Sequence, residues 1–167
     1  VKVDLGAASA SGTGGIAAIT AVFGSTLNAS VGGNTLVGPG GGKFWAIGAA
    51  GSGSVGGVAF SRIDALVAAS TGDILDYALF PGAVSVDLGL GVASGFLSIT
   101  GFRKVIGSAF ADMLVGDAND NTIAGLGGDD TLTGGGGNDA FDGGAGTDAV
   151  VESGEIDFTL AAGSLTG

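Results

Sequence analysis

Hydrophobic and polar residues recur with a period of nine residues in the last third of the chain. Each nonapeptide has a glycine at its first position, Asp or Asn at its sixth and a large apolar residue at its eighth. This order predicts a six-residue turn followed by a three-residue strand whose middle side chain points inward. The apolar positions are Leu114, Ile123, Leu132, Phe141 and Val150.

Two nonapeptides would complete one coil of eighteen residues, so turns that are eighteen residues apart would stack on the same edge. The turns that start at Gly107, Gly125 and Gly143 are then expected on one edge, and those that start at Gly116 and Gly134 on the other. Sixth-position side chains from two stacked turns would face a common gap. We rank these gaps in the order Asp130/Asp148, Asp112/Asp130 and Asn121/Asp139.

Oxygen atoms of these turns predict a calcium site. Aspartate oxygens and the carbonyl oxygens of glycine turns can complete a shell of six or more ligands, which suits Ca²⁺ better than Mg²⁺. In the alternative interpretation the acids form a solvated face and the glycines only make turns. The candidate metal ligands are Asp112, Asn121, Asp130, Asp139 and Asp148, together with Gly125, Gly127, Gly134, Gly136 and Gly143.

Charge is distributed unevenly along the chain. Residues 1–104 hold all five basic residues and five of the sixteen acids, whereas residues 105–167 hold the other eleven acids and no Lys or Arg. Nucleic acid is therefore an unsuitable partner, because phosphate binding requires positive charge. Crowded carboxylates without an internal cation repel one another, and an external cation would relieve that repulsion.

Composition argues against a disordered chain, against Cys- or His-based chemistry and against a membrane helix. The chain has 37 glycines in 167 residues, yet 46% hydrophobic and only 13% charged residues, which argues against disorder. Cysteine and histidine are absent, which excludes disulfides, thiolate nucleophiles and imidazole bases. The longest apolar run, residues 16–23, is too short for a membrane helix. Because the chain begins at Val1 without methionine, we expect an interior piece of a longer protein.

The best copies of the nonapeptide, GGGGNDAFD from Gly134 and GGAGTDAVV from Gly143, fit the pattern G-G-x-G-x-D-x-U-x. Residues 107–151 resemble the RTX calcium-binding repeats of bacterial proteins exported by type I secretion, and VSVDLGLGVASGF from Val84 resembles their usual lead-in. The resemblance implies a parallel β-roll, calcium-triggered folding outside the cell and export of the unfolded chain. It does not fix a function, since such repeats occur in toxins, proteases, lipases, adhesins and surface-layer proteins.

A longer repeat relates the two halves of the chain. A shift of 83 residues aligns the 25 residues from Val1 with those from Val84, with 12 identities. The place of Asp112 is then taken by Ala29. We therefore expect two units, a metal-free β-solenoid at 1–83 and a second unit at 84–167 that contains the calcium-binding nonapeptides 107–151.

The stretch between the two copies contains short β-favouring runs separated by glycine. KFWAIG, GSVGGVAF and DILDYALF read as strands that continue the solenoid, and residues 63–69 could form a helical turn. The whole chain is thus expected to be all-β, a parallel β-roll or β-solenoid with calcium-binding glycine-rich turns. Its core would include Trp45, Ile47, Val55, Val58 and Phe60.

The leading functional hypothesis is a non-enzymatic structural module of a large type I-secreted bacterial surface or matrix protein. It would be an adhesin stalk, surface-layer or filament element that folds on calcium outside the cell. Its partners would be calcium ions and either neighbouring repeats or further copies in a filament or lattice. One alternative is the secretion and chaperone roll of an exported hydrolase or toxin. Another is a flat face that binds ice or carbohydrate.

Overall fold

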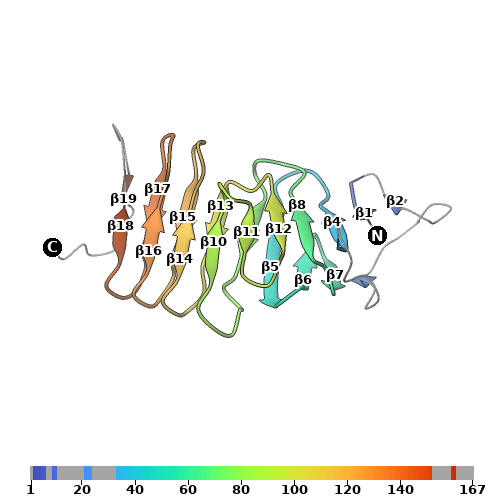
Figure 1. Ribbon diagram of the computed structural model, residues 1–167, viewed down its shortest axis with the longest axis horizontal. Coiled ribbons are helices and arrows are strands. Elements are labelled where there is room, and N and C mark those ends of the chain that lie inside the picture. Colours follow the sequence, from blue (N-terminus) through green and yellow to red (C-terminus); the bar gives the residue numbers. More distant parts are fainter. Residues whose placement is uncertain (1, 7–8, 11–20, 24–32, 152–158, 161–167) are drawn as a thin grey trace.

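Short strands make up all the regular structure in the part of the chain that the computed structural model describes, residues 2–6, 9–10, 21–23, 33–151 and 159–160. Figure 1 shows them as an elongated stack whose loops gather along two edges. The predicted all-β class is confirmed. No helix in these residues is long and apolar enough to cross a membrane.

Most strands are only three residues long. The first nine are β1 (Lys2–Asp4), β2 (Ser9–Ala10), β3 (Ala21–Phe23), β4 (Thr35–Val37), β5 (Phe44–Ala49), β6 (Ser52–Val55), β7 (Val58–Ser61), β8 (Ala65–Val67) and β9 (Ile74–Asp76). The others are β10 (Ser85–Asp87), β11 (Val92–Ala93), β12 (Ser98–Thr100), β13 (Lys104–Ile106), β14 (Met113–Val115), β15 (Thr122–Ala124), β16 (Thr131–Thr133), β17 (Ala140–Asp142), β18 (Ala149–Val151) and β19 (Thr159–Leu160).

The strands form one nine-stranded sheet and two five-stranded sheets. The nine-stranded sheet has the order β19-β17-β15-β13-β9-β5-β6-β7-β3. The five-stranded sheets have the orders β12-β8-β4-β1-β2 and β11-β10-β14-β16-β18. From β13 to β19 the chain alternates between the nine-stranded sheet and the second five-stranded sheet, so two strands and two loops make one coil.

From β13 to β18 the register is the eighteen-residue register that the sequence predicts, whereas β19 pairs with β17 at a spacing of nineteen residues. Leu114 pairs in parallel with Leu132, and Leu132 pairs with Val150 on the same sheet. On the other sheet, Ile123 pairs in parallel with Phe141. Four of these five residues are at most 2% exposed and Val150 is partly buried, so the middle residue of each strand points into the core. The predicted parallel β-roll is confirmed.

The middle of the chain departs from a simple parallel coil. β5, β6 and β7 form an antiparallel meander inside the nine-stranded sheet. Val55 pairs with Val58 across a two-residue turn, Gly56-Gly57, in which both residues have positive φ, 56° and 82°. Such a turn favours a tight hairpin, so GSVGGVAF is two strands and a turn instead of one strand.

The predicted helical turn at residues 63–69 is wrong. This segment contains strand β8, which pairs in parallel with β4 on one side and β12 on the other. Leu66 is fully buried between its neighbours Leu36 and Ile99. Tertiary burial of this one side chain, together with two parallel partners, outweighs the weak local helical pattern.

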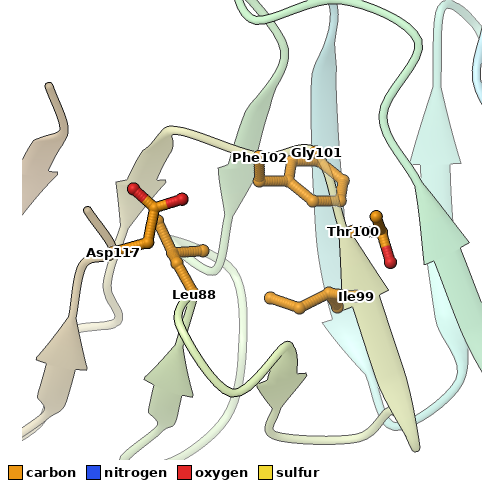
Figure 2. Close-up of a pocket in the computed structure, with 6 residues that line it drawn as sticks. All are labelled: Leu88, Ile99, Thr100, Gly101, Phe102 and Asp117. Atoms are coloured by element: carbon orange, nitrogen blue, oxygen red, sulfur yellow. The ribbon is translucent and has the colours of Figure 1, made fainter. Parts of the chain in front are cut away.

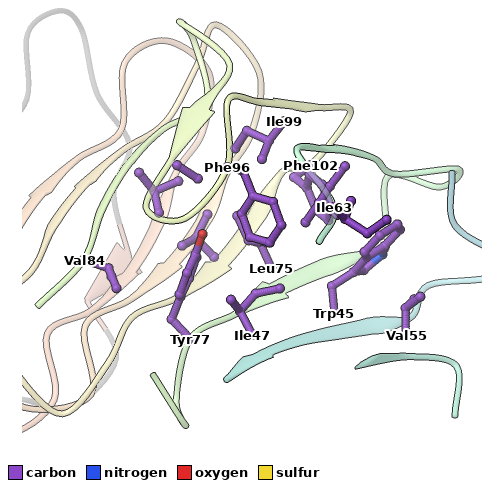
Figure 3. Close-up of a cluster of buried hydrophobic side chains, with 14 of the residues drawn as sticks. Trp45, Ile47, Val55, Ile63, Leu75, Tyr77, Val84, Phe96, Ile99 and Phe102 are labelled. Atoms are coloured by element: carbon purple, nitrogen blue, oxygen red, sulfur yellow. The ribbon is translucent and has the colours of Figure 1, made fainter. Parts of the chain in front are cut away.

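Aromatic side chains gather in the core near the middle of the chain (Figure 3). The Trp45 ring packs edge-on against Phe102 and Phe60, at centroid distances of 5.4 Å and 6.4 Å. The predicted core residues Trp45, Ile47, Val55 and Phe60 are buried, and Val58 is partly buried against them. These residues belong to the same buried cluster as the core side chains of the roll.

Described parts of the two sequence copies have corresponding strands. Val3 and Ala10 are antiparallel partners, and so are Val86 and Ala93, which lie 83 residues further on. Strands β3 and β13 are related by the same shift. Ala29, which stands in the place of Asp112, lies outside the described residues. The division into units at 1–83 and 84–167 therefore stays a prediction.

Candidate metal centre

The loops of the roll lie along two edges, which we call the first and the second edge. Loops 107–112, 125–130 and 143–148 run from the nine-stranded to the five-stranded sheet and form the first edge. Loops 116–121 and 134–139 run back and form the second edge. The two edges are visible at the ends of β14 to β18 in Figure 1. This grouping is the one that the period of eighteen residues predicts.

Each sixth-position side chain of the roll lies just before its strand. Asp112, Asn121, Asp130 and Asp139 are all at most 4% exposed, and Asp148 is partly buried. Burial of carboxylates is costly unless each one is paired or hydrogen-bonded. The roll therefore has to satisfy buried acids along the first edge and Asp139 at the second edge.

Backbone N–H groups satisfy part of this requirement. Each pre-strand aspartate accepts a hydrogen bond, 2.7 to 3.0 Å long, from the N–H at the equivalent position of the neighbouring strand. The same arrangement occurs outside the nonapeptides. The acceptor and donor pairs are Asp64 with Asn34, Asp73 with Lys43, Asp112 with Val84, Asp130 with Asp112, Asp139 with Asn121 and Asp148 with Asp130.

Asp130 has one oxygen that these bonds do not satisfy. Its Oδ1 accepts the N–H of Asp112 at 2.8 Å, whereas its Oδ2 is buried and has no hydrogen-bond partner in the structure. A Cβ atom at Gly125 would overlap this Oδ2 and would lie 2.6 Å from the carbonyl oxygen of Gly143. The Oδ2 atom of Asp130 and the carbonyl oxygen of Gly143 thus both lie close to Gly125, where two loops stack.

The raised pKa of the Asp130 carboxyl also indicates a site that would accept a cation. Burial raises the pKa of the Asp130 carboxyl to about 6; the N–H of Asp112 lowers it, and the carboxylates of Asp112, Asp148 and Asp129 raise it further. A cation beside Oδ2 would favour the charged carboxylate instead. A buried, unpartnered carboxylate oxygen next to a carbonyl oxygen fits a hard cation with oxygen ligands such as Ca²⁺.

The gap between Asp112 and Asp130 has a similar arrangement. A Cβ atom at Gly107 would overlap Asp112 Oδ2 and lie 2.7 Å from the carbonyl oxygen of Gly125. Asp112 is better satisfied than Asp130, because it accepts bonds from both the N–H and the hydroxyl of Ser108. This gap contains two carboxylates, as does the gap between Asp130 and Asp148.

The second edge repeats the oxygen arrangement with less charge. A Cβ atom at Gly116 would overlap the carbonyl oxygen of Gly134 and the Oδ1 atom of Asn121. The Oδ1 atom of Asn121 also accepts the N–H of Asp117 at 2.8 Å, and the side chain of Asp139 is the only sixth-position carboxylate in this gap.

Two of the glycines predicted as ligands, Gly127 and Gly136, contact the neighbouring loop, and their role as ligands stays a prediction. Gly127 forms a β-bridge with Ala145, and the N–H of Gly136 donates to the carbonyl of Asp117 at 2.8 Å. Within the described ranges, no three acidic side chains come close enough to hold a metal by themselves. A calcium shell in this roll therefore needs main-chain carbonyls, and those of Gly125, Gly134 and Gly143 lie beside the sixth-position side chains.

Sequence reasoning missed two acids at the fifth position of the loops, one at each edge. Asp120 Oδ1 accepts the N–H of Asn138 at 2.9 Å, and Asp129 Oδ1 accepts the N–H of Thr147 at 2.8 Å. Each bond joins residues that are eighteen apart, so it links two stacked loops. The signal in the sequence was the run Asp, Asp, Asn and Thr at every ninth position from 120 to 147.

Leu126 occupies a loop position that favours glycine. Its φ is 77°, and the equivalent residues Gly135 and Gly144 have φ of 99° and 90°. We expect Leu126→Gly to stabilise the roll by about 1 kcal/mol, because a left-handed conformation strains a side chain with a Cβ atom. Urea unfolding followed by circular dichroism would measure this gain. A loss of stability would mean that the half-exposed Leu126 side chain packs favourably.

A small hollow lies next to the second edge, lined by Leu88, Ile99, Thr100, Gly101, Phe102 and Asp117 (Figure 2). Its volume is about 30 Å³. This is room for a water molecule or two and not for an organic ligand. The hollow therefore provides no substrate pocket.

An eighteen-residue coil of parallel strands, with acidic residues and glycine carbonyls at its loops, defines a parallel β-roll with cation sites between stacked loops. The family model of the RTX calcium-binding nonapeptide repeat matches this region in four copies, over residues 106–139 and 115–150. Residues 106–150 are thus RTX calcium-binding nonapeptide repeats, and repeats of this family bind calcium ions. No curated protein matches the chain.

Proposed function

We propose that this chain is a calcium-stabilised structural module of a large bacterial protein that is exported by type I secretion and acts at the cell surface or in the matrix. Its roll would stiffen an adhesin stalk, a surface-layer element or a filament. The buried, unpartnered Oδ2 atom of Asp130 is the observation that carries this proposal, since it gives the folded roll a reason to need a cation.

The proposed ligands follow from the geometry of the loops. Calcium would bind in the gaps between sixth-position side chains, with Asp130 shared between the two gaps of the first edge. Carbonyl oxygens of Gly125 and Gly143 would complete the shells. The role assigned to each of these residues is part of the proposal.

Calcium binding would make folding of the roll depend on whether the chain is in the cytosol or outside the cell. Extracellular calcium modules typically bind at about 10⁻⁴ to 10⁻³ M, so the low calcium of the cytosol would leave the sites empty. Eleven acids without a basic residue in 105–167 would then repel one another and keep this part of the chain unfolded for export. Outside the cell, binding free energy would become folding free energy.

A non-enzymatic role agrees with the residues at hand. The chain contains no His or Cys, and its RTX repeats are a structural calcium-binding family. The acids of the loops accept backbone hydrogen bonds in a regular row, which is an arrangement that supports stacking. Further copies of the chain, or neighbouring repeats, would extend the stack at its exposed end strands.

The proposal predicts a large response to calcium. We expect the β-sheet signal and the thermal midpoint of the chain to rise when millimolar CaCl₂ replaces EDTA. One saturated site, at a hundred times its dissociation constant, would add about 2.7 kcal/mol. Far-UV circular dichroism with thermal melts would measure this, and MgCl₂ at the same concentration is the control. An unchanged midpoint in calcium would overturn the proposal.

A further inference from the structure

The two edges of the roll differ in the charge of their sixth-position side chains although their oxygen atoms are arranged alike. Between stacked loops of the first edge, the described gaps hold the carboxylates of Asp112 and Asp130, and of Asp130 and Asp148. At the second edge, the gap between loops 116–121 and 134–139 holds Asn121 in place of one carboxylate. Halving the ligand charge weakens a calcium site, because affinity depends on the number of charged ligands.

Both polar atoms of the Asn121 side-chain amide form hydrogen bonds at the second edge. Its Oδ1 atom accepts the N–H of Asp117 at 2.8 Å, and its Nδ2 atom donates to the Asp117 carboxylate at 3.3 Å and to the Arg103 carbonyl at 3.4 Å. Its backbone N–H donates to Asp139 at 2.8 Å. Asp130 at the first edge has, by contrast, a buried carboxylate oxygen with no partner.

A basic side chain already stands at the second edge. Arg103 lies at the pre-strand position next to Asn121, and its guanidinium donates to the Oδ1 atom of Asn119 at 3.0 Å. The carboxylate of Asp117 receives the N–H and the side-chain amide of Asn119, both at 2.8 Å, so it is folded into the same network. No Lys or Arg occurs in residues 105–167, so the first edge has no such cation from the nonapeptides.

We infer that, of the three described gaps between nonapeptide loops, calcium binds at the two of the first edge, and that Arg103 and Asn121 close the gap between loops 116–121 and 134–139 without calcium. This inference rests on the proposed function, because it assigns the calcium of that function to particular loops. Calcium would thus stabilise the first edge of the roll, whereas the described gap of the second edge would already be held by hydrogen bonds to the carboxylates of Asp117 and Asp139 and by one guanidinium.

Two alanine variants form a matched test. Asp112 and Asn121 are both buried, both accept a bond from the second N–H of their loop, and both donate their own N–H to an aspartate of the next coil at 2.8 Å. The full chain of each variant would be titrated with CaCl₂ by isothermal calorimetry. Its thermal midpoint would be measured in EDTA and in calcium.

We expect Asp112→Ala to bind one calcium ion fewer than the unaltered chain and to show a smaller rise of the midpoint in calcium. Asn121→Ala should lower both midpoints, yet keep the number of bound ions and the full rise. Should Asn121→Ala fail to fold, Asn121→Ser provides the same comparison, since its hydroxyl can still accept a hydrogen bond. A lost ion in either Asn121 variant would overturn the inference. An unaltered chain that binds no calcium would instead refute the proposed function.

Discussion

Asp130→Asn is expected to remove most of the calcium-dependent stability of the roll. Asp130 is the sixth-position acid shared by both gaps of the first edge, through the pairs Asp112/Asp130 and Asp130/Asp148. The amide keeps an acceptor for the Asp112 N–H but loses the charge beside the Gly143 carbonyl. Two saturated sites would contribute about 5 kcal/mol, so the rise of the midpoint in calcium should shrink by roughly 10–20 °C.

Asp129→Asn is the control for this experiment. Asp129 is the adjacent residue, is exposed, and accepts the N–H of Thr147, a bond that an amide can keep. Thermal melts of both variants in EDTA and in CaCl₂ would separate loss of a ligand from loss of one general negative charge. Equal losses in the two variants would show that Asp130 acts only through the net charge of the loops.

The roll was predictable because its information is local and repeated. Every ninth residue fixes an inward side chain, as at Leu132, and the turns between them bring residues eighteen apart to the same edge. The stacking of Asp112, Asp130 and Asp148 follows from that period alone. Repetition makes this possible, since one coil contacts only its neighbours and all the coils share one geometry.

The partners of the carboxylates were not predictable in the same way. The sequence predicts the sixth-position acids as metal ligands. It does not predict that Asp130, Asp139 and Asp148 each also accept a backbone N–H from the adjacent coil. Asp73 shows why, because it forms the same bond, with Lys43, in a part of the chain without nonapeptides. For Asp73 the bond depends on the register between segments thirty residues apart, which no local pattern specifies. In the roll the eighteen-residue period sets the register, but it does not show which group the carboxylate accepts from.

The middle of the chain shows a different limit of sequence reasoning. The runs around Trp45 and Phe60 were recognised as core strands from their composition, and both side chains are buried. The antiparallel pairing of β6 with β7 is not predicted, although the pair Gly56-Gly57 is a sequence signal for a two-residue hairpin. The helical turn predicted around Leu66 is wrong because a three-residue strand leaves too little sequence for its period to appear.

Leu132→Ala should cost about 2–5 kcal/mol of folding stability in calcium. Leu132 is fully buried in β16, between Leu114 and Val150 of the adjacent coils, so its removal leaves a cavity in the centre of the roll. Each coil of a solenoid is stabilised mainly by its neighbours, and the loss would therefore weaken the coils on both sides. Urea unfolding followed by far-UV circular dichroism would measure the cost.

The same substitution in EDTA tests whether the core and the ion depend on each other. If the roll folds only with calcium, Leu132 is already exposed in EDTA, and the substitution should change the unfolding curve by less than about 0.5 kcal/mol. Met113→Ala is the control, since Met113 is 55% exposed on the neighbouring strand β14 and should have little effect in either solution. Equal costs of Leu132→Ala in calcium and in EDTA would mean that this core forms without the ion. Calcium would then strengthen a roll that is already folded.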